Sequence, residues 1–257
     1  LVEEKLSQTL MEKYNYAFLR SGHKDTPQTL VEKFTFEYPY EHQRFIPGKV
    51  SVSELKKAAM EEDVREMFEE PEIVPYIPAF LREERKVSSA ERGTAYHRVA
   101  ECMDLSGVRH SRQVEERIEQ LVLQGKMTQA AADTINSYDI YVFCQSELCR
   151  RMLNAEQKMK LYKEQPFVFA KAAREVYPEY DSEQEILVQG IMDAYFEEND
   201  EIVLIDYKTD HVKTEEELVK RYKKQLEIYA ESLEQMTGKR VKERILYSFC
   251  LGKEIFV

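Results

Sequence analysis

The chain has 257 residues, of which 43% are hydrophobic and 33% charged. A chain of this length and composition buries a substantial core in one domain or at most two, which excludes a disordered tail. No stretch approaches the roughly 18 consecutive apolar residues that a membrane span needs, so we expect no contact with a membrane. The formal net charge of −11 argues against a general polyanion binder held by bulk charge. Residues from Tyr207 to Val257 are nonetheless locally basic, with 11 Lys and Arg against 9 Asp and Glu.

The first part of the chain is predicted to connect the main domain to a preceding part of a longer polypeptide. The first residue is Leu1 rather than Met or a basic signal segment, so we expect a domain excised from a longer polypeptide. Apolar residues recur about once per helical turn between residues 6 and 18, and an aromatic, proline-punctuated stretch follows at 34–48. We interpret residues 1–46 as a helical and extended lead-in and residues 47–257 as the main domain.

Helices are predicted to dominate the first half of the main domain. The sequence SVSE at Ser51 fits a helix-capping signal, and the three prolines of PEIVPYIP require a loop soon after that helix. Gly107 and Gly125 mark breaks between the later helical patterns. The predicted helices cover 54–69, 91–104, 111–124 and 128–153.

The second half changes to a strand-like period. In most of this half, the residues alternate in polarity or form short apolar runs, which is typical of strands. In residues 215–236 the apolar residues recur instead at helical spacing. The predicted strands are 166–173, 186–196, 201–208 and 241–251, and the predicted helix is 215–236. This order indicates an α/β domain in which helices flank a small central mixed β-sheet.

Charged side chains concentrate in two neighbouring strands of this sheet. Alternate residues of a strand share a face, so Asp206 and Lys208 project to the same side. The polar tip EENDE predicts a tight hairpin centred between Asn199 and Asp200, which places Asp193 opposite Asp206. Two carboxylates facing each other repel unless a cation lies between them. The pattern therefore predicts a Mg²⁺ site, with Lys208 beside the water that attacks a phosphate.

A solvated sheet face is the plain alternative for this pair of aspartates. In that reading Lys208 merely neutralises one carboxylate. The neighbouring residues Ile202, Leu204, Leu187 and Ile191 are expected to share the same faces, and they would be unusual companions for solvated charges. Burial would make an unpaired acid pair costly, which favours the cation site.

The same strands carry a resemblance to a known family. The segment GIMDAYFEENDEIVLIDYKTD resembles the central block of the PD-(D/E)XK nuclease superfamily, with Asp206 as the second acid. Four further pieces are similar to the RecB-like branch, in the form found in the C-terminal nuclease domains of AddA-type helicase-nuclease subunits. They are SVSELK at Ser51, GTAYHRV with Gly93 and His97, EQPF with Glu164 ahead of a strand, and KKQLEIYAESL with Gln225 and Tyr229. The resemblance covers about residues 47–257.

The resemblance implies a restriction-endonuclease-like fold and a set of metal ligands. It assigns metal ligation to His97, Asp193, Asp206 and the backbone carbonyl of Tyr207, with Lys208 as the catalytic lysine. A neutral imidazole is an acceptable ligand, and Gly93 one turn earlier allows the helix to approach the sheet. For His97 alone, a surface or hydrogen-bonded core histidine is the alternative.

Two residues of the last predicted helix are also implied to border the active site. Gln225 and Tyr229 are four residues apart and lie on one helix face. The alternative is a core stripe with one polar edge residue, and for Tyr229 both descriptions fit. Arg221 and Lys224 in the same helix are candidates for phosphate contacts, although such runs are often merely solvated.

The family also sets expectations for cofactors and partners. It implies a Mg²⁺-dependent DNA exonuclease, with Mn²⁺ as a substitute, that processes double-strand ends for recombinational repair in the bacterial cytoplasm. Single-stranded DNA delivered by a helicase and an AddB-like second subunit would be its partners. Alternatives from other classes are a catalytically silent nuclease-like module that binds DNA or another protein chain, and an acidic helical interaction module.

The cysteines argue against an iron-sulfur cluster. Some relatives hold such a cluster with one upstream cysteine and three near the C-terminus, but this chain has only Cys250 in its last hundred residues. Cys102, Cys144 and Cys149 complete the set, with neither CxxC spacing nor a nearby zinc-finger histidine. We expect buried, reduced thiols, no cluster, and a protein that is AddA-like rather than AddB-like.

Overall fold

The computed structural model describes residues 46–55, 89–177, 180 and 182–257. The chain divides into two compact units, Leu1–Ile46 and Pro47–Val257, and every element described here belongs to the second. The predicted lead-in over 1–46 and most of the predicted helix over 54–69 lie outside the described residues. In the part that is described, no helix combines the length and the apolar character needed to cross a membrane.

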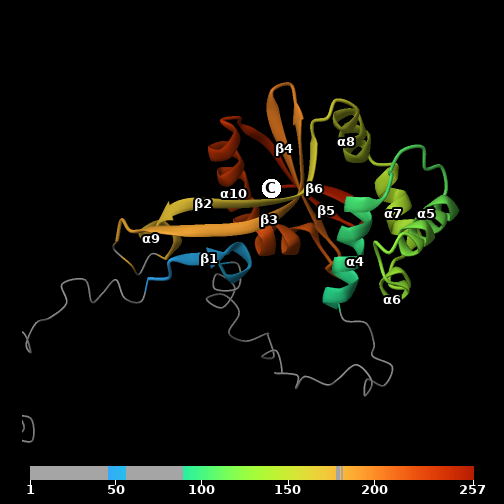
Figure 1. Ribbon diagram of the computed structural model, residues 1–257, viewed down its shortest axis with the longest axis horizontal. Coiled ribbons are helices and arrows are strands. Elements are labelled where there is room, and N and C mark those ends of the chain that lie inside the picture. Colours follow the sequence, from blue (N-terminus) through green and yellow to red (C-terminus); the bar gives the residue numbers. More distant parts are fainter. Residues whose placement is uncertain (1–45, 56–88, 178–179, 181) are drawn as a thin grey trace, which may run out of the picture. The chain divides into compact units, whose positions relative to one another are not determined.

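Six strands within the described residues form one mixed sheet (Figure 1). They are β1 (Lys49–Ser51), β2 (Leu161–Ala172), β3 (Glu185–Glu198), β4 (Glu201–Lys208), β5 (Val241–Ser248) and β6 (Lys253–Phe256). The order is β1-β3-β4-β5-β6, and β2 pairs with the other edge of β3. The pairs β1–β3 and β4–β5 are parallel and the other pairs are antiparallel. The predicted α/β fold with a small mixed sheet is confirmed.

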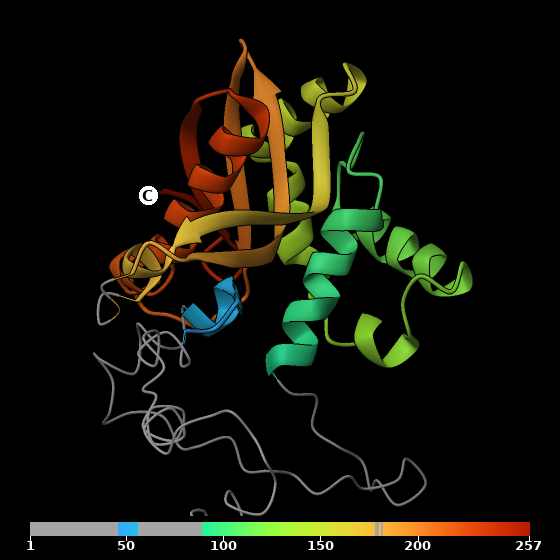
Figure 2. The ribbon, with the colours of Figure 1, turned by 60° about the vertical axis from the view of Figure 1, so that its left-hand side comes forward.

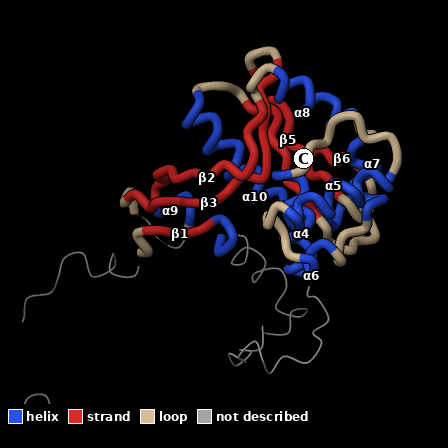
Figure 3. Tube along the Cα trace, turned by 45° about the vertical axis from the view of Figure 1, so that its right-hand side comes forward, coloured by secondary structure: helices blue, strands red, loops and turns tan. Residues whose placement is uncertain are grey.

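The long strand β3 joins two parts of this sheet. Its first half pairs with β1 at residues 187–189, and its second half pairs with β4 at residues 194–198. The end formed by β1, β2 and β3 extends away from the part built on β4 and β5 (Figure 3). Along this edge of β3, residues 190–193 fall between the two partner strands. The sheet therefore opens at Asp193.

The hairpin between β3 and β4 has the predicted register. Asn199 and Asp200 have φ values of 55° and 66°, as the central residues of a two-residue type I′ turn require. Glu198 faces Glu201, and Ala194 faces Ile205 at the other end of the ladder. One step further along this register, Asp193 is level with Asp206.

Helices cover one face of the sheet with a shared hydrophobic core (Figure 2). They are α4 (Ser89–Cys102), α5 (Ser111–Leu123), α6 (Gln129–Ala132), α7 (Ser137–Cys144) and α8 (Glu147–Gln157), and a short helix α9 (Ala173–Val176) follows β2. The residues of β4 that join this core are Val203, Ile205 and Tyr207. Asp206 and Lys208 alternate with them and face the other way.

The prediction of one helix over 128–153 is wrong, because three residues in this range act as helix N-caps. The side chains of Thr128, Asn136 and Ser146 accept hydrogen bonds from the backbone amides of Ala131, Tyr138 and Cys149. Each cap begins a new helix, so the segment folds as α6, α7 and α8. The predicted strand over 241–251 is three residues too long, because β5 ends at Ser248. The strand β6 that follows Gly252 is not among the predicted elements.

Helix α10 (Glu215–Thr237) covers the face opposite to α4–α8 and packs on β2, β4 and β5. Its buried stripe includes Leu218, Leu226 and Leu233. The helix ends at Gly238, whose φ of 69° is the left-handed conformation of a C-terminal cap. The predicted bounds of 215–236 differ from the observed helix by one residue.

The predicted capping signal at Ser51 is present. The backbone amide and hydroxyl of Ser51 donate to Glu54 Oε2 at 2.7 and 2.8 Å, and the amide of Glu54 donates to Ser51 Oγ at 3.2 Å. This reciprocal pair is a capping box. It fixes the chain directly after β1, which pairs with β3 close to the opening in the sheet.

Candidate active site

The candidate site lies where β3 and β4 part. Their ladder ends at the pair Ala194 and Ile205, and β4 continues alongside β5 as far as Lys208. Beyond that point the amide of Tyr207 donates to Asp193 Oδ2 at 2.7 Å. A carboxylate thus takes the place of a strand carbonyl. Both Asp193 and the backbone of Tyr207 are fixed at the opening.

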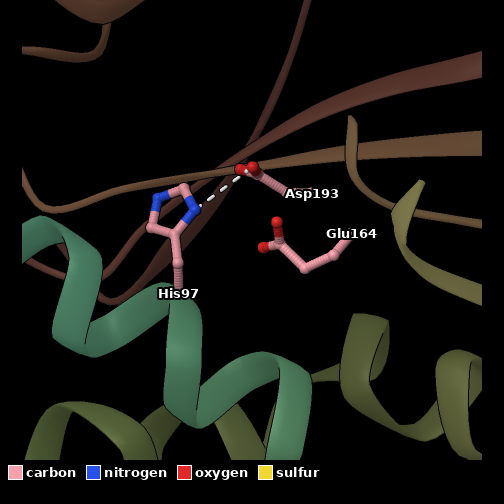
Figure 4. A group of neighbouring side chains, drawn as sticks. All are labelled: His97, Glu164 and Asp193. Carbon is pink, nitrogen blue, oxygen red and sulfur yellow. Dashed lines mark ion pairs between the residues drawn. The ribbon is translucent and has the colours of Figure 1, made fainter. Parts of the chain in front are cut away.

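His97 reaches this opening from α4 (Figure 4). Its Nδ1 atom lies 3.1 Å from Asp193 Oδ1, and its Nε2 atom lies 3.0 Å from the carbonyl oxygen of Tyr207. Both partners are acceptors, so a protonated ring satisfies both. Burial lowers the pKa of His97, but the hydrogen bond and charge of Asp193 outweigh burial and leave the pKa raised. A Cβ on Gly93 would lie 3.4 Å from Thr209 Oγ1, which is an ordinary contact, so the helix does not require glycine there.

Glu164 is the third member of this group. The ligand atoms of His97, Glu164 and Asp193 all lie within 4.8 Å of one another, and Figure 4 shows the two carboxylates side by side. Glu164 stands across from Asp193, between the pairs Lys163–Ala194 and Gln165–Met192. It has a φ of 48°, an uncommon conformation for a residue with a side chain. Burial raises its pKa, and the charge of Asp193 raises the pKa further.

The position of Glu164 corrects the sequence interpretation, which placed it ahead of a strand. Strand β2 begins at Leu161, so Glu164 lies inside the strand. The EQPF motif marks Glu164 in the sequence without giving it a role. A strand that starts at residue 161 and pairs with β3 places Glu164 across from Asp193. The positive φ has no signal in the sequence, because glycine or asparagine usually marks such a position.

The second cluster joins Asp206 to Lys208 and α10. The Nζ atom of Lys208 lies 2.5 Å from Asp206 Oδ2. From α10, Gln225 Nε2 donates to Asp206 Oδ1 at 3.1 Å and to the hydroxyl of Tyr229 at 2.9 Å. The ring of Tyr229 packs edge-on against Phe167, with 5.4 Å between centroids. Tyr229 is therefore both a core residue and part of the site's border.

The two clusters share an excess of negative charge. Burial raises the pKa of Asp206 to about 6, and the charge of Asp193 adds to this rise while Lys208 opposes it. For Asp193, burial opposes ionisation, but the bond to His97 outweighs burial and the pKa is lowered. Asp206 is 1% exposed, and the ammonium of Lys208 is the cation that faces its Oδ2 atom, at 2.5 Å.

The donor set itself matches a small divalent ion. Carboxylate oxygens, one imidazole nitrogen and a backbone carbonyl are ligands that Mg²⁺ or Mn²⁺ accepts. The ligand atoms of His97, Glu164 and Asp193 form one group, and His97 Nε2 also contacts the carbonyl of Tyr207. Asp206 is not a member of this group, so its role as a ligand of the same ion stays a prediction. The donors of His97, Glu164 and Asp193 fit a divalent metal.

The apolar neighbours expected beside the two aspartates are only half confirmed. Ile202 and Leu204 are fully buried, but Leu187 is 44% and Ile191 53% exposed. Both residues pair with β2, and Leu187 also pairs with β1, on the part of β3 that lies beyond the ladder with β4. Asp206 pairs with Leu246 of β5 and accepts a hydrogen bond from Gln225 of α10.

The basic residues of α10 divide between two roles. Arg221 Nη1 donates to Asp210 Oδ1 at 2.8 Å, so this guanidinium has a partner within the fold. Lys224 is exposed, with Glu227 at 4.0 Å. Of these two cations, Lys224 keeps the accessible position expected of a phosphate contact.

Cysteine positions differ from the prediction of four buried thiols. Cys149 is buried, Cys102 and Cys144 are partly buried, and Cys250 is exposed. Cys144 ends α7 and Cys149 lies in α8, so they are not on a single helix. The sulfur of Cys250 lies 3.4 Å from His211 Nδ1. The expectation of no iron-sulfur cluster stays a prediction.

A groove of about 680 Å³ lies beside His97 and Glu164. Residues of α4 and of the segment between α5 and α6 line it together with Glu164. Its other lining residues include Thr94, Arg98, Lys126 and Thr128. The groove gives an extended ligand direct access to His97 and Glu164.

Comparison with known proteins identifies the class to which this fold and site belong. The sequence profile described as the PD-(D/E)XK nuclease superfamily matches residues 44–253. The chain belongs to this superfamily, and the resemblance noted in the sequence is confirmed.

The relatives narrow the class further. The chain is homologous over its length to the AddA subunits of ATP-dependent helicase/nucleases. The protein from Clostridium botulinum (strain Loch Maree / Type A3) is 35% identical over 265 residues, covering 99% of this chain and 20% of the relative. The protein from Lachnoclostridium phytofermentans is 34% identical over 301 residues, covering 88% and 22%. The chain thus spans about a fifth of these relatives.

Among solved structures, that of SSO0001 covers 80% of this chain and 75% of its own at 13% identity. Its TM-score of 0.28 makes the likeness too distant to bear on function.

Proposed function

We propose that this chain is a Mg²⁺-dependent deoxyribonuclease domain that hydrolyses phosphodiester bonds. The observation that carries the proposal is the group of His97, Glu164 and Asp193 where β3 and β4 part, with Asp206 and Lys208 at the adjacent end of β4. The ligand atoms of the first three lie within 4.8 Å of one another, and Lys208 Nζ lies 2.5 Å from Asp206 Oδ2. Membership of the PD-(D/E)XK superfamily supports the same chemistry.

His97, Asp193, Asp206 and the carbonyl of Tyr207 would hold the metal, with Glu164 beside them. When bound, Mg²⁺ or Mn²⁺ polarises the scissile phosphate and makes a nearby water more acidic. Gln225 orients Asp206 by donating to Oδ1, and Tyr229 in turn fixes the Gln225 amide. Hydrogen bonds from neighbouring side chains to a ligating carboxylate hold that carboxylate in the orientation that the metal needs.

Lys208 would position the attacking water and offset the charge that develops on the phosphate. Its ammonium is held next to Asp206 and is almost fully buried. Burial lowers the pKa of Lys208, but the charges of Asp206 and Asp193 outweigh burial and raise it, so the group stays a cation. No covalent intermediate is required.

We infer that the substrate is single-stranded DNA and that the domain acts as an exonuclease on strands delivered by a helicase. The relatives' name supports a connection to helicase activity, and an AddB-like second subunit in the bacterial cytoplasm would complete the assembly. The groove beside His97 and Glu164 would give a strand a path to the metal. Its lining holds the cations Arg98 and Lys126 among three glutamates, so phosphates would contact these two cations.

Degradation of end-labelled linear single-stranded DNA tests this proposal. The wild-type chain should degrade DNA with Mg²⁺ or Mn²⁺ and not with EDTA. Asp206→Asn should abolish degradation and weaken metal binding, whereas Lys208→Ala should keep the metal and lose on the order of 10² in rate. Both variants should keep DNA binding in Ca²⁺.

Two substitutions of the same kind at exposed positions are the controls. Asp200→Asn changes a carboxylate at the tip of the same hairpin, and Lys223→Ala removes a cation from the surface of α10. Neither should change the rate. A wild-type chain that binds DNA in Ca²⁺ but never cuts it with Mg²⁺ or Mn²⁺ would instead be a silent, nuclease-like binding module.

A further inference from the structure

The ammonium of Lys208 has a second neighbour that the reaction described above does not use. Its Nζ atom lies 4.4 Å from the centroid of the Tyr222 ring, which α10 presents from the side opposite the helices α4–α8. Tyr222 is buried, and Gln225 follows it on the next turn of the same helix. One helix face therefore contacts both Lys208 and Asp206.

The Tyr222 ring is itself fixed through its hydroxyl group. The hydroxyl donates to Asp210 Oδ2 at 2.8 Å, and the other oxygen of Asp210 accepts from Arg221 Nη1 at 2.8 Å. Burial raises the pKa of Tyr222, and the charge of Asp210 raises it further, so the phenol remains a hydrogen-bond donor. These bonds tie the loop that follows Lys208 to α10.

We propose that Tyr222, held by Asp210 and Arg221, is a positioning residue that aims the ammonium of Lys208 at the reacting phosphate. This inference rests on the proposed function. Asp206 would be shared between Lys208 and the metal, so it is a weaker anchor for the ammonium once the metal is bound. The ring face attracts the cation without competing for the metal.

The need for such an anchor follows from the lysine side chain. An ammonium on a flexible four-carbon stem has many conformations, and a small misplacement of a charge-stabilising group reduces the rate strongly. The Tyr222 ring restricts these conformations from one side and Asp206 from the other. A tyrosine that only filled the core would have no effect on the lysine.

Steady-state kinetics of two variants separate the ring from the hydroxyl. Tyr222→Phe keeps the ring, so kcat should stay within about threefold of wild type, whereas Tyr222→Leu should lower kcat roughly 3- to 30-fold, as expected for a lost cation–π contact. KM for DNA and Mn²⁺ affinity should not change in either variant. Tyr247→Phe is the matched control, because it removes from the opposite core a buried hydroxyl that has no hydrogen-bond partner among the described residues.

The proposal is overturned if Tyr222→Leu folds normally and keeps the wild-type kcat. It is also overturned if kcat falls as much in Tyr222→Phe as in Tyr222→Leu, because the aromatic ring would then have no role of its own. Thermal unfolding of each variant shows whether the fold is intact.

A spectroscopic measurement tests the contact without relying on activity. Protons above an aromatic ring shift upfield, so the ε-methylene protons of Lys208 should be upfield in the wild-type chain and in Tyr222→Phe, and should return to ordinary values in Tyr222→Leu. Unshifted protons in the wild-type chain would overturn the proposal. Shifted protons in a chain that never cuts DNA would leave the contact standing and refute the nuclease function instead.

Arg221→Gln distinguishes this arrangement from a phosphate contact by the same side chain. If Arg221 acts through Asp210 and the Tyr222 hydroxyl, kcat should fall no further than in Tyr222→Phe, within about threefold, and KM for DNA should be unchanged. If KM rises while kcat is kept, Arg221 binds the substrate and its role in holding Tyr222 is refuted.

Discussion

Glu164 shows how a single residue couples local strain to the proposed metal site. It combines a positive φ with a half-buried carboxylate next to Asp193, and burial together with the charge of Asp193 raises the pKa of Glu164. Residues in such conformations persist where the surrounding structure fixes them, often at functional sites. In the metal-free chain this carboxylate is a source of repulsion.

Replacing this carboxylate should stabilise the metal-free protein. The pKa of Glu164 in the folded chain lies above its ordinary value of 4.5, so folding disfavours its ionised form. The penalty is absent below the unfolded pKa and is complete above the folded pKa. Glu164→Gln should therefore raise the free energy of unfolding in EDTA at pH 7 by a few tenths of a kcal/mol, with no gain at pH 4.

Urea unfolding of both proteins at the two pH values measures this difference. Glu185→Gln, at an exposed glutamate that begins β3, is the control and should change nothing. Equal gains at pH 4 and pH 7 would show that the effect comes from packing rather than from charge.

At the scale of elements, α10 carries the side chains that hold the second cluster. Tyr222, Gln225 and Tyr229 contact Lys208, Asp206 and one another from successive turns. The helix runs to Thr237, and Gly238 caps it in a left-handed conformation. The amide of Gly238 donates to the carbonyl of Glu234, as a C-terminal cap requires.

A side chain at this cap should weaken the fold. Gly238→Ala has open space around its Cβ, so its cost comes from the backbone conformation alone. We expect a loss of about 1 kcal/mol in the free energy of unfolding. Gly48→Ala, where a Cβ also meets nothing within 4 Å and φ is not positive, should cost less than half as much in the same chemical denaturation experiment. Equal losses would contradict the conformational explanation.

The sequence predicted elements well where one pattern dominated. The alternation of apolar residues and the EENDE turn predicted the hairpin register, and the amphipathic stripe predicted α10 to within one residue. Prediction failed between residues 128 and 153, where polar caps divide an apolar pattern into three helices. Local hydrogen bonds outweighed periodicity there.

The candidate site was predictable in part for similar reasons. His97, Asp193, Asp206 and Lys208 stand in recognisable motifs, and the hairpin register brings Asp193 level with Asp206 just beyond the end of the ladder. The partner of Arg221 and the contact of Tyr222 with Lys208 were not predictable, because they depend on how α10 packs across β4. The exposure of Leu187 and Ile191 depends on the divergence of β3 from β4, which no local pattern encodes.

At the scale of the whole molecule, the acidic opening should make stability depend on metal. A ligand that binds only the folded state stabilises it by about 2.7 kcal/mol at a hundredfold excess over its Kd. Saturating Mn²⁺ should raise the unfolding temperature of the wild-type chain, because it relieves repulsion among buried carboxylates. Asp193→Asn should lose this response, whereas Asp200→Asn should keep it.

Differential scanning calorimetry with Mn²⁺ and with EDTA measures the response. An equal rise in all three proteins would indicate binding elsewhere on the acidic surface. If the unfolding temperature of the wild-type chain did not rise at millimolar Mn²⁺, a metal site with a Kd below the millimolar range would be contradicted.

The central claim is that one opening in the sheet holds a catalytic metal, and a crystal grown with Mn²⁺ tests it most directly. Anomalous scattering distinguishes Mn²⁺ from water or a lysine ammonium. We predict a peak bounded by His97, Asp193 and Asp206, at about 2.0 to 2.3 Å from its ligand atoms. A well-ordered crystal at saturating Mn²⁺ in which this opening shows no anomalous peak, or shows one only at other carboxylates, would contradict the account.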